Sequence, residues 1–354
     1  MKAWPWFVPA LSLVFLVTGM VAGVGTSLVF LCTAGLVGAV AAAVHHAEVV
    51  AHRVGEPFGT LVLAVAVTVI EASLILSMML AGGAEVRSLP RDTIYAAIMI
   101  ICNGVVGACV LVGGLVHREQ SFRAEGANAG LAGLIAMAAL SLVLPAFTIS
   151  TPGGTYSVLQ LEFAAITSAV LWAVYVFIQT VRHRDYFLPT DATNAEEHAA
   201  PPTNREALVS FGLLLVSLVA VVGLAKILSP AIESALVKAG APAAVLGILI
   251  AMLVLMPEGF AAIRAARANR LQTSMNLAIG SALASIGLTI PVVAVAAIVL
   301  DMRLVLGLGD KDLVMLVVTF LVSIVTLASG RTHMMQGAVH LVLFATFIFL
   351  AFVP

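Results

Sequence analysis

Long apolar stretches alternate with short polar segments along nearly the whole chain. A helix of about 20 apolar residues crosses the hydrocarbon core of a bilayer, so each stretch predicts one membrane span. Gly23 to Thr26 either form a turn between the first two spans or kink one long helix. We predict about eleven spans, at residues 7–22, 25–46, 57–81, 93–116, 127–149, 157–181, 206–228, 242–266, 273–300, 311–329 and 335–353.

Composition narrows the class of protein further. The chain has 354 residues, of which 62% are hydrophobic and 10% are charged, too apolar for a soluble domain. Backbone groups must be satisfied internally in lipid, and the runs lack the alternation of a membrane barrel, so we expect an all-α polytopic membrane protein. The net charge of −1 predicts no nucleic-acid partner. We expect Cys32, Cys102 and Cys109 to be packing residues, and the first apolar run to be a span rather than a cleaved leader.

Residues 182–205 interrupt the apolar pattern with a charged, proline-containing segment that we interpret as a cytoplasmic linker. It follows an extra first span at 1–24 and a five-span half at 25–181, and precedes a second five-span half at 206–354. An odd number of spans in each half gives the halves opposite orientations. This is the organisation of an inverted repeat, in which the substrate site lies near the midplane.

Lysine and arginine residues in the loops predict the orientation of the chain. With a cytoplasmic N-terminus, the inner segments hold eleven of these residues and the outer segments hold six. The positive-inside rule therefore favours a cytoplasmic N-terminus and a periplasmic C-terminus. The inner set is Lys2, Arg53, Arg118, Arg123, Arg182, Arg184, Arg205, Arg264, Arg267, Arg270 and Arg331, and the outer set is Arg87, Arg91, Lys226, Lys238, Arg303 and Lys311.

Two glutamates stand out because each lies within an apolar span, Glu71 in the first half and Glu258 in the second. A charged carboxylate at bilayer depth costs roughly 2.5–3.5 kcal/mol on insertion scales, so such residues mark functional sites. The alternative for each is a protonated structural carboxyl, and Glu258 could also lie near the cytoplasmic face because Arg264 follows it closely.

Small polar side chains lie in the span of Glu71 and in the span that follows each glutamate. Thr68 precedes Glu71 by one helical turn, Asn103 lies in the next span of the first half, and Ser281 and Ser285 lie in the corresponding span of the second. Together with two carboxylates they would form an all-oxygen site, which suits Ca²⁺ with its about 6–8 oxygen ligands. A helix broken at Pro257 could add carbonyl oxygens. Interhelical hydrogen bonding is the alternative role for these polar residues.

Charge balance predicts how such a site would work. Two ionised glutamates neutralise one Ca²⁺, whereas two carboxylates in a dry site without a cation would take up protons. A site filled either by Ca²⁺ or by protons performs exchange.

Other polar residues lie near the predicted inner ends of spans. Glu56 either caps the third span or acts in gating. His45, His46 and His52 are candidates for proton entry or pH sensing. His45, Glu48 and His52 share one helical face, so an interfacial polar cluster and a metal site are alternatives.

The segments GEPFGTLVLAVAVTVIEASLI and PEGFAAIRAARANRLQTSMNLAIGSALASIGLTIPVV resemble the two repeats of ChaA-type bacterial calcium/proton antiporters. These form part of the cation/proton exchanger branch of the calcium/cation antiporter superfamily. The resemblance implies an extra span followed by two inverted five-span repeats, with Glu71 and Glu258 carrying Ca²⁺ or H⁺ alternately. It also implies ligating or supporting roles for Asn103, Ser281 and Ser285.

The sequence departs from the superfamily pattern just before both glutamates. Many members have Gly-Asn there, whereas this chain reads VTVIE and LMPE. We expect a Ca²⁺/H⁺ antiporter of a bacterial inner membrane, with no cofactor beyond the transported ions. The alternatives are a Na⁺(K⁺)/H⁺ antiporter on the same scaffold and a cation channel, and no motif predicts an enzyme.

Overall fold

The computed structural model describes residues 4–23, 25–55, 58–81, 85–188, 202–240, 242 and 244–353, and it is almost entirely helical. Every predicted span coincides with a helix or a short series of helical segments, which confirms the all-α polytopic prediction. Among these residues, ten helices are long and apolar enough to cross a membrane. The third span corresponds to α3 (Phe58–Ala81), which contains a shorter apolar stretch, Val65–Leu80.

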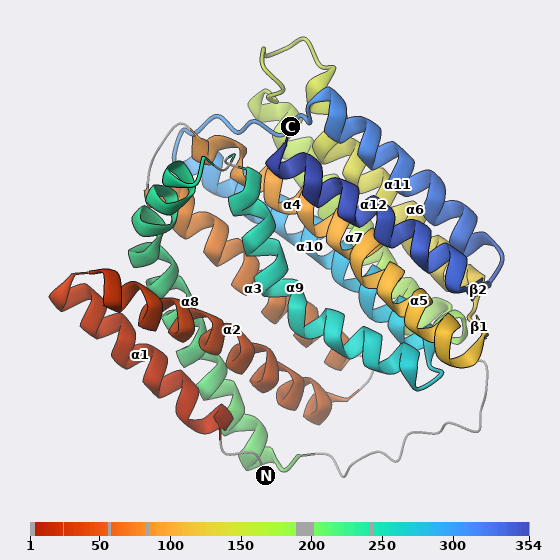
Figure 1. The fold of residues 1–354 in the computed structure, drawn as a ribbon, viewed down its shortest axis with the longest axis horizontal. Coiled ribbons are helices and arrows are strands. Elements are labelled where there is room, and N and C mark those ends of the chain that lie inside the picture. The colour runs from red at the N-terminus through yellow and green to blue at the C-terminus, as the bar shows by residue number, and fades with distance from the viewer. Residues whose placement is uncertain are drawn as a thin grey trace. The chain divides into compact units, whose positions relative to one another are not determined.

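The helices form two compact units, each with helices from both halves of the sequence (Figure 1). The first unit contains α1 (Trp4–Ala22), α2 (Thr26–Val54), α3 and α8 (Asn204–Lys238). The second contains α4 (Leu89–Met99), α5 (Val106–His117), α6 (Ala124–Ala138), α7 (Val158–Phe177), α9 (Ala244–Arg267), α10 (Leu271–Val299), α11 (Asp310–Ala328) and α12 (Met334–Phe352). The predicted repeats are therefore not the compact units, and their inverted relationship remains a prediction.

Two helices continue well beyond their predicted C-terminal ends. α2 continues from the predicted end at 46 to Val54, and α8 continues from 228 to Lys238. The apolar run marks only the part of a helix inside the bilayer. The helix itself continues into the polar region until a residue with a non-helical backbone conformation ends it. For α2 this residue is Gly55, whose φ of 75° is readily available only to glycine. The histidines near the end of this span therefore lie within a helix.

Three spans of the second unit contain π-helical turns, which periodicity could not predict. They are η2 (Ile100–Val105) between α4 and α5, η3 (Ala139–Val143) after α6, and η5 (Ile178–Arg182) after α7. Short 3-10 turns, η1 (Glu85–Ser88), η4 (Leu144–Ala146) and η6 (Arg184–Phe187), extend other helix ends. A π-helical turn widens the helix locally and is frequent at functional sites. Of the three, η2 carries Asn103.

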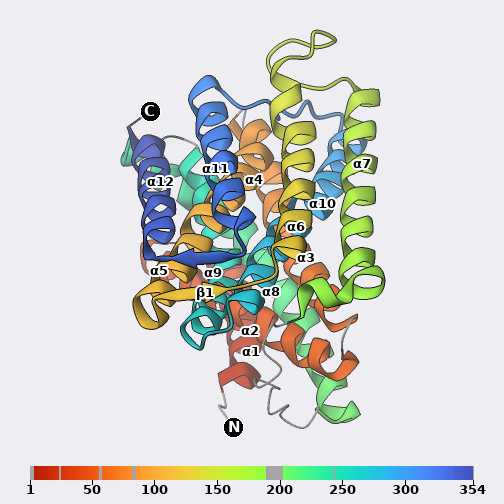
Figure 2. The ribbon, with the colours of Figure 1, turned by 90° about the vertical axis from the view of Figure 1, so that its right-hand side faces the viewer.

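Two short strands join loops of the second unit that are far apart in sequence. β1 (Glu119–Ser121) pairs antiparallel with β2 (Arg331–His333), with Gln120 opposite Thr332. Figure 2 shows this ribbon crossing one end of α5 and α12, with the C-terminal end of α12 at the other end of the unit. The Gln120 amide also donates to the carbonyl of Ala266, where α9 ends, at 2.9 Å. Three loops predicted to be cytoplasmic thus meet at one end of this unit.

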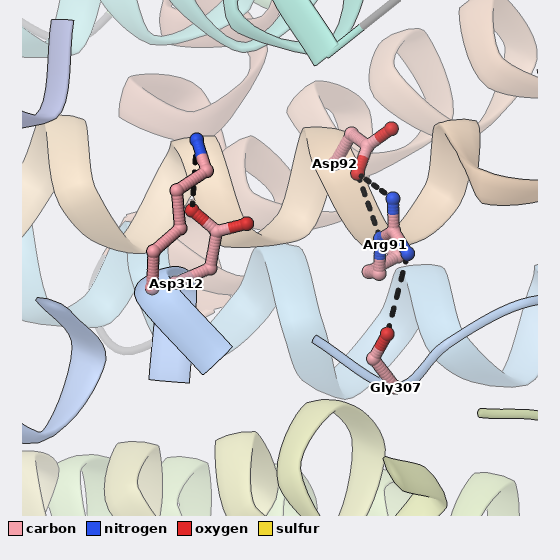
Figure 3. A network of polar contacts seen from close by, with 5 residues as sticks. Arg91, Asp92, Gly307 and Asp312 are labelled. Atoms are coloured by element: carbon pink, nitrogen blue, oxygen red, sulfur yellow. Dashed lines mark hydrogen bonds and ion pairs between the residues drawn. The ribbon is translucent and has the colours of Figure 1, made fainter. Parts of the chain in front are cut away.

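A second polar network joins predicted periplasmic segments of the same unit (Figure 3). The Arg91 guanidinium contacts one oxygen of Asp92 at 2.8 Å and donates to the carbonyl of Gly307 at 3.2 Å. Lys311 and Asp312 lie close by, 3.8 Å apart. Because the charges of Arg91 and Asp92 neutralise each other, Asp92 can be buried at the start of α4.

Candidate cation site

Glu71 lies on α3, in the apolar interior of the first unit. Its side chain is 2% exposed, and the neighbouring Ile70 and Ile75 are fully buried. Thr68 lies one turn earlier on the same face and is also buried. Thr68 and Glu71 thus lie buried on one helical face, and their joint role at an ion site stays a prediction.

Glu258 lies on α9 in the second unit and is 9% exposed. The Ser281 hydroxyl on α10 donates a hydrogen bond to Oε2 of Glu258. The corner between α9 and α10 is short, so the two helices pack as neighbours and the serine reaches the carboxylate. The structure thus brings together two of the residues that the sequence assigned to the site.

Ser285 follows Ser281 by one turn of α10 and is buried. It therefore lies on the same face of the helix as the serine that contacts Glu258. Pro257 does not break α9, which runs continuously from Ala244 to Arg267, so the expectation of a broken helix was wrong. Pro257 nevertheless lacks an N–H, so the carbonyl of Leu253 has no helical donor at that position.

Asn103 takes part in a buried polar network with α11 and α12. Its amide nitrogen donates to the Thr319 hydroxyl at 2.8 Å, and its amide oxygen lies 3.1 Å from Nδ1 of His340. Nε2 of the same ring lies 3.0 Å from the Thr326 hydroxyl. Both amide atoms are therefore engaged within this network.

Asn103 lies in η2, with its amide directed toward α11 and α12. Val105, two residues later and hence on nearly the opposite face, approaches Gly259 of α9. The helix that carries Glu258 thus contacts the other side of this segment. We interpret Asn103 as a supporting residue, one of the two roles implied by the resemblance. The sequence indicated neither Thr319 nor Thr326 as a partner in this network.

The polar residues near the end of α2 differ in their exposure. His46 is fully buried, His45 is half-buried and His52 is exposed. Glu56 lies outside the described residues. In the part of the chain that the structure describes, no group of three or more His, Cys, Asp or Glu side chains could hold a metal ion. The metal-site alternative at His45, Glu48 and His52 therefore has no structural support.

The two glutamates belong to different compact units, so their convergence on one ion remains a prediction. Within its own unit, each lies on an apolar helix with an oxygen-bearing neighbour, Thr68 on α3 or Ser281 on α10. These are hard oxygen groups of the kind that bind alkali and alkaline-earth cations.

The family model for the sodium/calcium exchanger protein matches residues 24–181 and 209–353, on either side of the linker. The chain belongs to the sodium/calcium exchanger family. The resemblance found in the sequence is thereby confirmed, and this exchanger is a polytopic membrane protein of a cation antiporter family rather than of an enzyme family. The matched segments lie close to the two predicted repeats.

Relatives of this exchanger extend over nearly its whole length. It is 46% identical to the putative ionic transporter y4hA of Sinorhizobium fredii, over 99% of this chain and 96% of the relative. It is 35% identical to the sodium-potassium/proton antiporter ChaA of Escherichia coli, over 90% of this chain and 87% of ChaA. The crystal structure of the Ca²⁺/H⁺ antiporter protein YfkE matches with a TM-score of 0.75 and 16% identity, covering 100% of both chains. That structural likeness shows the fold.

Proposed function

We propose that this protein is a secondary active antiporter that exports Ca²⁺ from the cytoplasm in exchange for inward protons across a bacterial inner membrane. The observation that carries the proposal is the burial of one carboxylate in each half, Glu71 at 2% and Glu258 at 9% exposure, on the apolar helices α3 and α9. Thr68, Ser281 and Ser285 would complete the oxygen site, and Asn103 would support it.

The exchange follows from the electrostatics of the two acids. Occupied by Ca²⁺, the site is neutral with both carboxylates ionised. Without the cation, burial and mutual repulsion favour protonation, so the site turns back to the first side of the membrane with protons bound. Neither ion is released without the other being bound, which couples the two fluxes.

Alternating access would follow from the predicted inverted repeats. Five spans lie between 25 and 181 and five between 206 and 353, and the family model matches these two segments. We propose that the halves move against each other so that the site faces the cytoplasm and the periplasm in turn. The proposed topology places the N-terminus in the cytoplasm and the C-terminus in the periplasm.

Substituting the acids tests the mechanism. In everted membrane vesicles, Glu71→Gln and Glu258→Gln should each abolish ΔpH-driven Ca²⁺ uptake while the protein is still expressed and helical. Glu162→Gln is a matched control, because Glu162 also lies on a spanning helix, α7, but is exposed. Wild-type uptake in either variant would remove that glutamate from the site.

The second candidate is Na⁺(K⁺)/H⁺ antiport, and the name of the Escherichia coli relative favours it. Adding Ca²⁺, Na⁺ or K⁺ separately to vesicles with a preformed ΔpH distinguishes the cargo, because only a transported cation dissipates the gradient. We expect dissipation with Ca²⁺ and none with Na⁺ or K⁺, and the reverse result would establish the second candidate. A channel would instead carry current under voltage without a proton gradient.

A further inference from the structure

A proline in α1 leaves a backbone carbonyl for a side chain of α2 to bind. Residue 9 of a regular helix would donate its N–H to the carbonyl of residue 5. Pro9 has no N–H, so the carbonyl of Pro5 has no helical donor. Nε2 of His46, on α2, lies 2.9 Å from this oxygen. A carbonyl only accepts, so Nε2 must carry the proton of the neutral ring.

The other ring nitrogen of His46 makes no hydrogen bond within the described part of the chain. Nδ1 of His46 is buried and has no hydrogen-bond partner among the described residues. The imidazole is 1% exposed, with the Trp6 ring 6.4 Å and the His45 ring 5.5 Å from it. While α1 is docked, a proton added at Nδ1 would be a buried donor without an acceptor, on a buried cation.

Among the described residues, few charged groups lie on the helices that pack around this contact. α1 carries no charged or titratable side chain, and α3 carries only Glu71. The described charges of α8 are Arg205 and Glu206 in its first turn, with Lys226 and Lys238 toward its other end. On α2 itself the neighbours are His45 and, farther along, Glu48, His52 and Arg53.

α1 otherwise packs closely against α2. The Ser12 hydroxyl donates to the carbonyl of Gly35 at 2.9 Å, and the side chains of Val8 and Phe15 approach glycines of α2. Separating the helices at the first turn of α1 exposes His46 to water from the side of the membrane where α1 begins.

We propose that His46 is a proton-binding latch: the neutral ring fastens the first turn of α1 to α2, and a proton taken up from water at Nδ1 releases it. The proton binds to the ring nitrogen lone pair, and the hydrogen bond to Pro5 is exchanged for bonds to water. The latch adds regulation by pH on one side of the membrane to the proposed transport, and it does not depend on which cation is carried.

Accessibility of a cysteine at the interface tests the latch without measuring transport. Ser12→Cys replaces a buried hydroxyl with a thiol of similar size, and its reaction with N-ethylmaleimide in proteoliposomes reports separation of α1 from α2. Rates are compared at the same pH with and without His46→Gln, so that thiol ionisation cancels in the ratio. The buried native thiols Cys102 and Cys109 of the other unit, resolved by peptide mass, report general unfolding.

The ratio compared is the rate with His46 divided by the rate with Gln at that position. We expect it to be near 1 at about pH 8, because glutamine also donates to the Pro5 carbonyl but does not titrate. Below about pH 6.5, the His46 protein should react faster by up to about tenfold per pH unit. His52→Gln, an exposed site on the same helix, should keep this pH dependence. A ratio that stays constant with pH would refute the latch.

A second variant covers the case in which His46→Gln does not fold. Pro9→Ala restores an N–H that competes with His46 for the Pro5 carbonyl. Combined with Ser12→Cys, this substitution should make the introduced thiol react faster than in the Ser12→Cys parent already at about pH 8. An unchanged rate would show that the bond between His46 and Pro5 does not hold α1 in place.

Discussion

The Ser281 hydroxyl donates a hydrogen bond to the carboxylate of Glu258, which joins α10 to α9. A hydrogen bond to a charged group contributes about 1.5–3 kcal/mol, and here it stabilises the ionised form of the acid. The serine thus affects the competition between cation and proton at Glu258.

Ser281→Ala should therefore favour the proton. The variant should need a roughly tenfold or higher cation concentration for half-maximal ΔpH-driven uptake, with the largest effect at acidic pH. Ser217→Ala is the control, because among the described residues that buried hydroxyl bonds to the carbonyl of Leu213 in its own helix. Equal cation dependence in both variants would contradict a role for Ser281 at the carboxylate.

Asn103→Ala should reduce stability more than cation binding. It removes the partner of the His340 ring and of the Thr319 hydroxyl, and leaving a buried polar group unsatisfied costs about 1–3 kcal/mol. Thermal unfolding in detergent should begin several degrees lower, while the stabilisation produced by added Ca²⁺ should be retained. Loss of that stabilisation at unchanged intrinsic stability would make Asn103 a ligand.

Gly114→Ala should destabilise the second unit where α5 meets the start of α12. A Cβ at residue 114 would lie 2.5 Å from the backbone nitrogen of Met334, and backbone there cannot move aside cheaply. We expect a loss of about 1–3 kcal/mol, measured as a lower midpoint of thermal unfolding. Gly212→Ala, in α8 with no atom within 4 Å of its Cβ position, should be neutral or slightly stabilising.

The proposed topology predicts labelling from opposite sides of the membrane. Ser121 in β1 and Ile149 after α6 are both exposed, at opposite ends of one helical span. In intact cells, a membrane-impermeant maleimide should label Ile149→Cys and should reach Ser121→Cys only after permeabilisation. The opposite pattern would invert the topology, and the buried native cysteines provide the background.

Sequence periodicity was sufficient to predict the spans, because a bilayer requires about 20 apolar residues and leaves the backbone no alternative to a helix. It was less accurate at helix ends. The end of α2 at Gly55 depends on a backbone conformation rather than on hydropathy. The sequence could not predict η2 either, since a π-helical turn depends on packing against neighbouring helices.

The sequence by itself determined the membrane class, the spans, the family and the burial of the two acids, because each follows from local composition or a contiguous motif. Only the tertiary structure decided the partners of individual side chains: Ser281 for Glu258, His340 and Thr319 for Asn103, and Pro5 for His46. Such pairs join different helices. The hydropathy of a span does not depend on the rotation of its helix about the helix axis, so it cannot show which neighbour a polar side chain faces. Packing fixes that rotation, and with it the chemistry that each polar residue can perform.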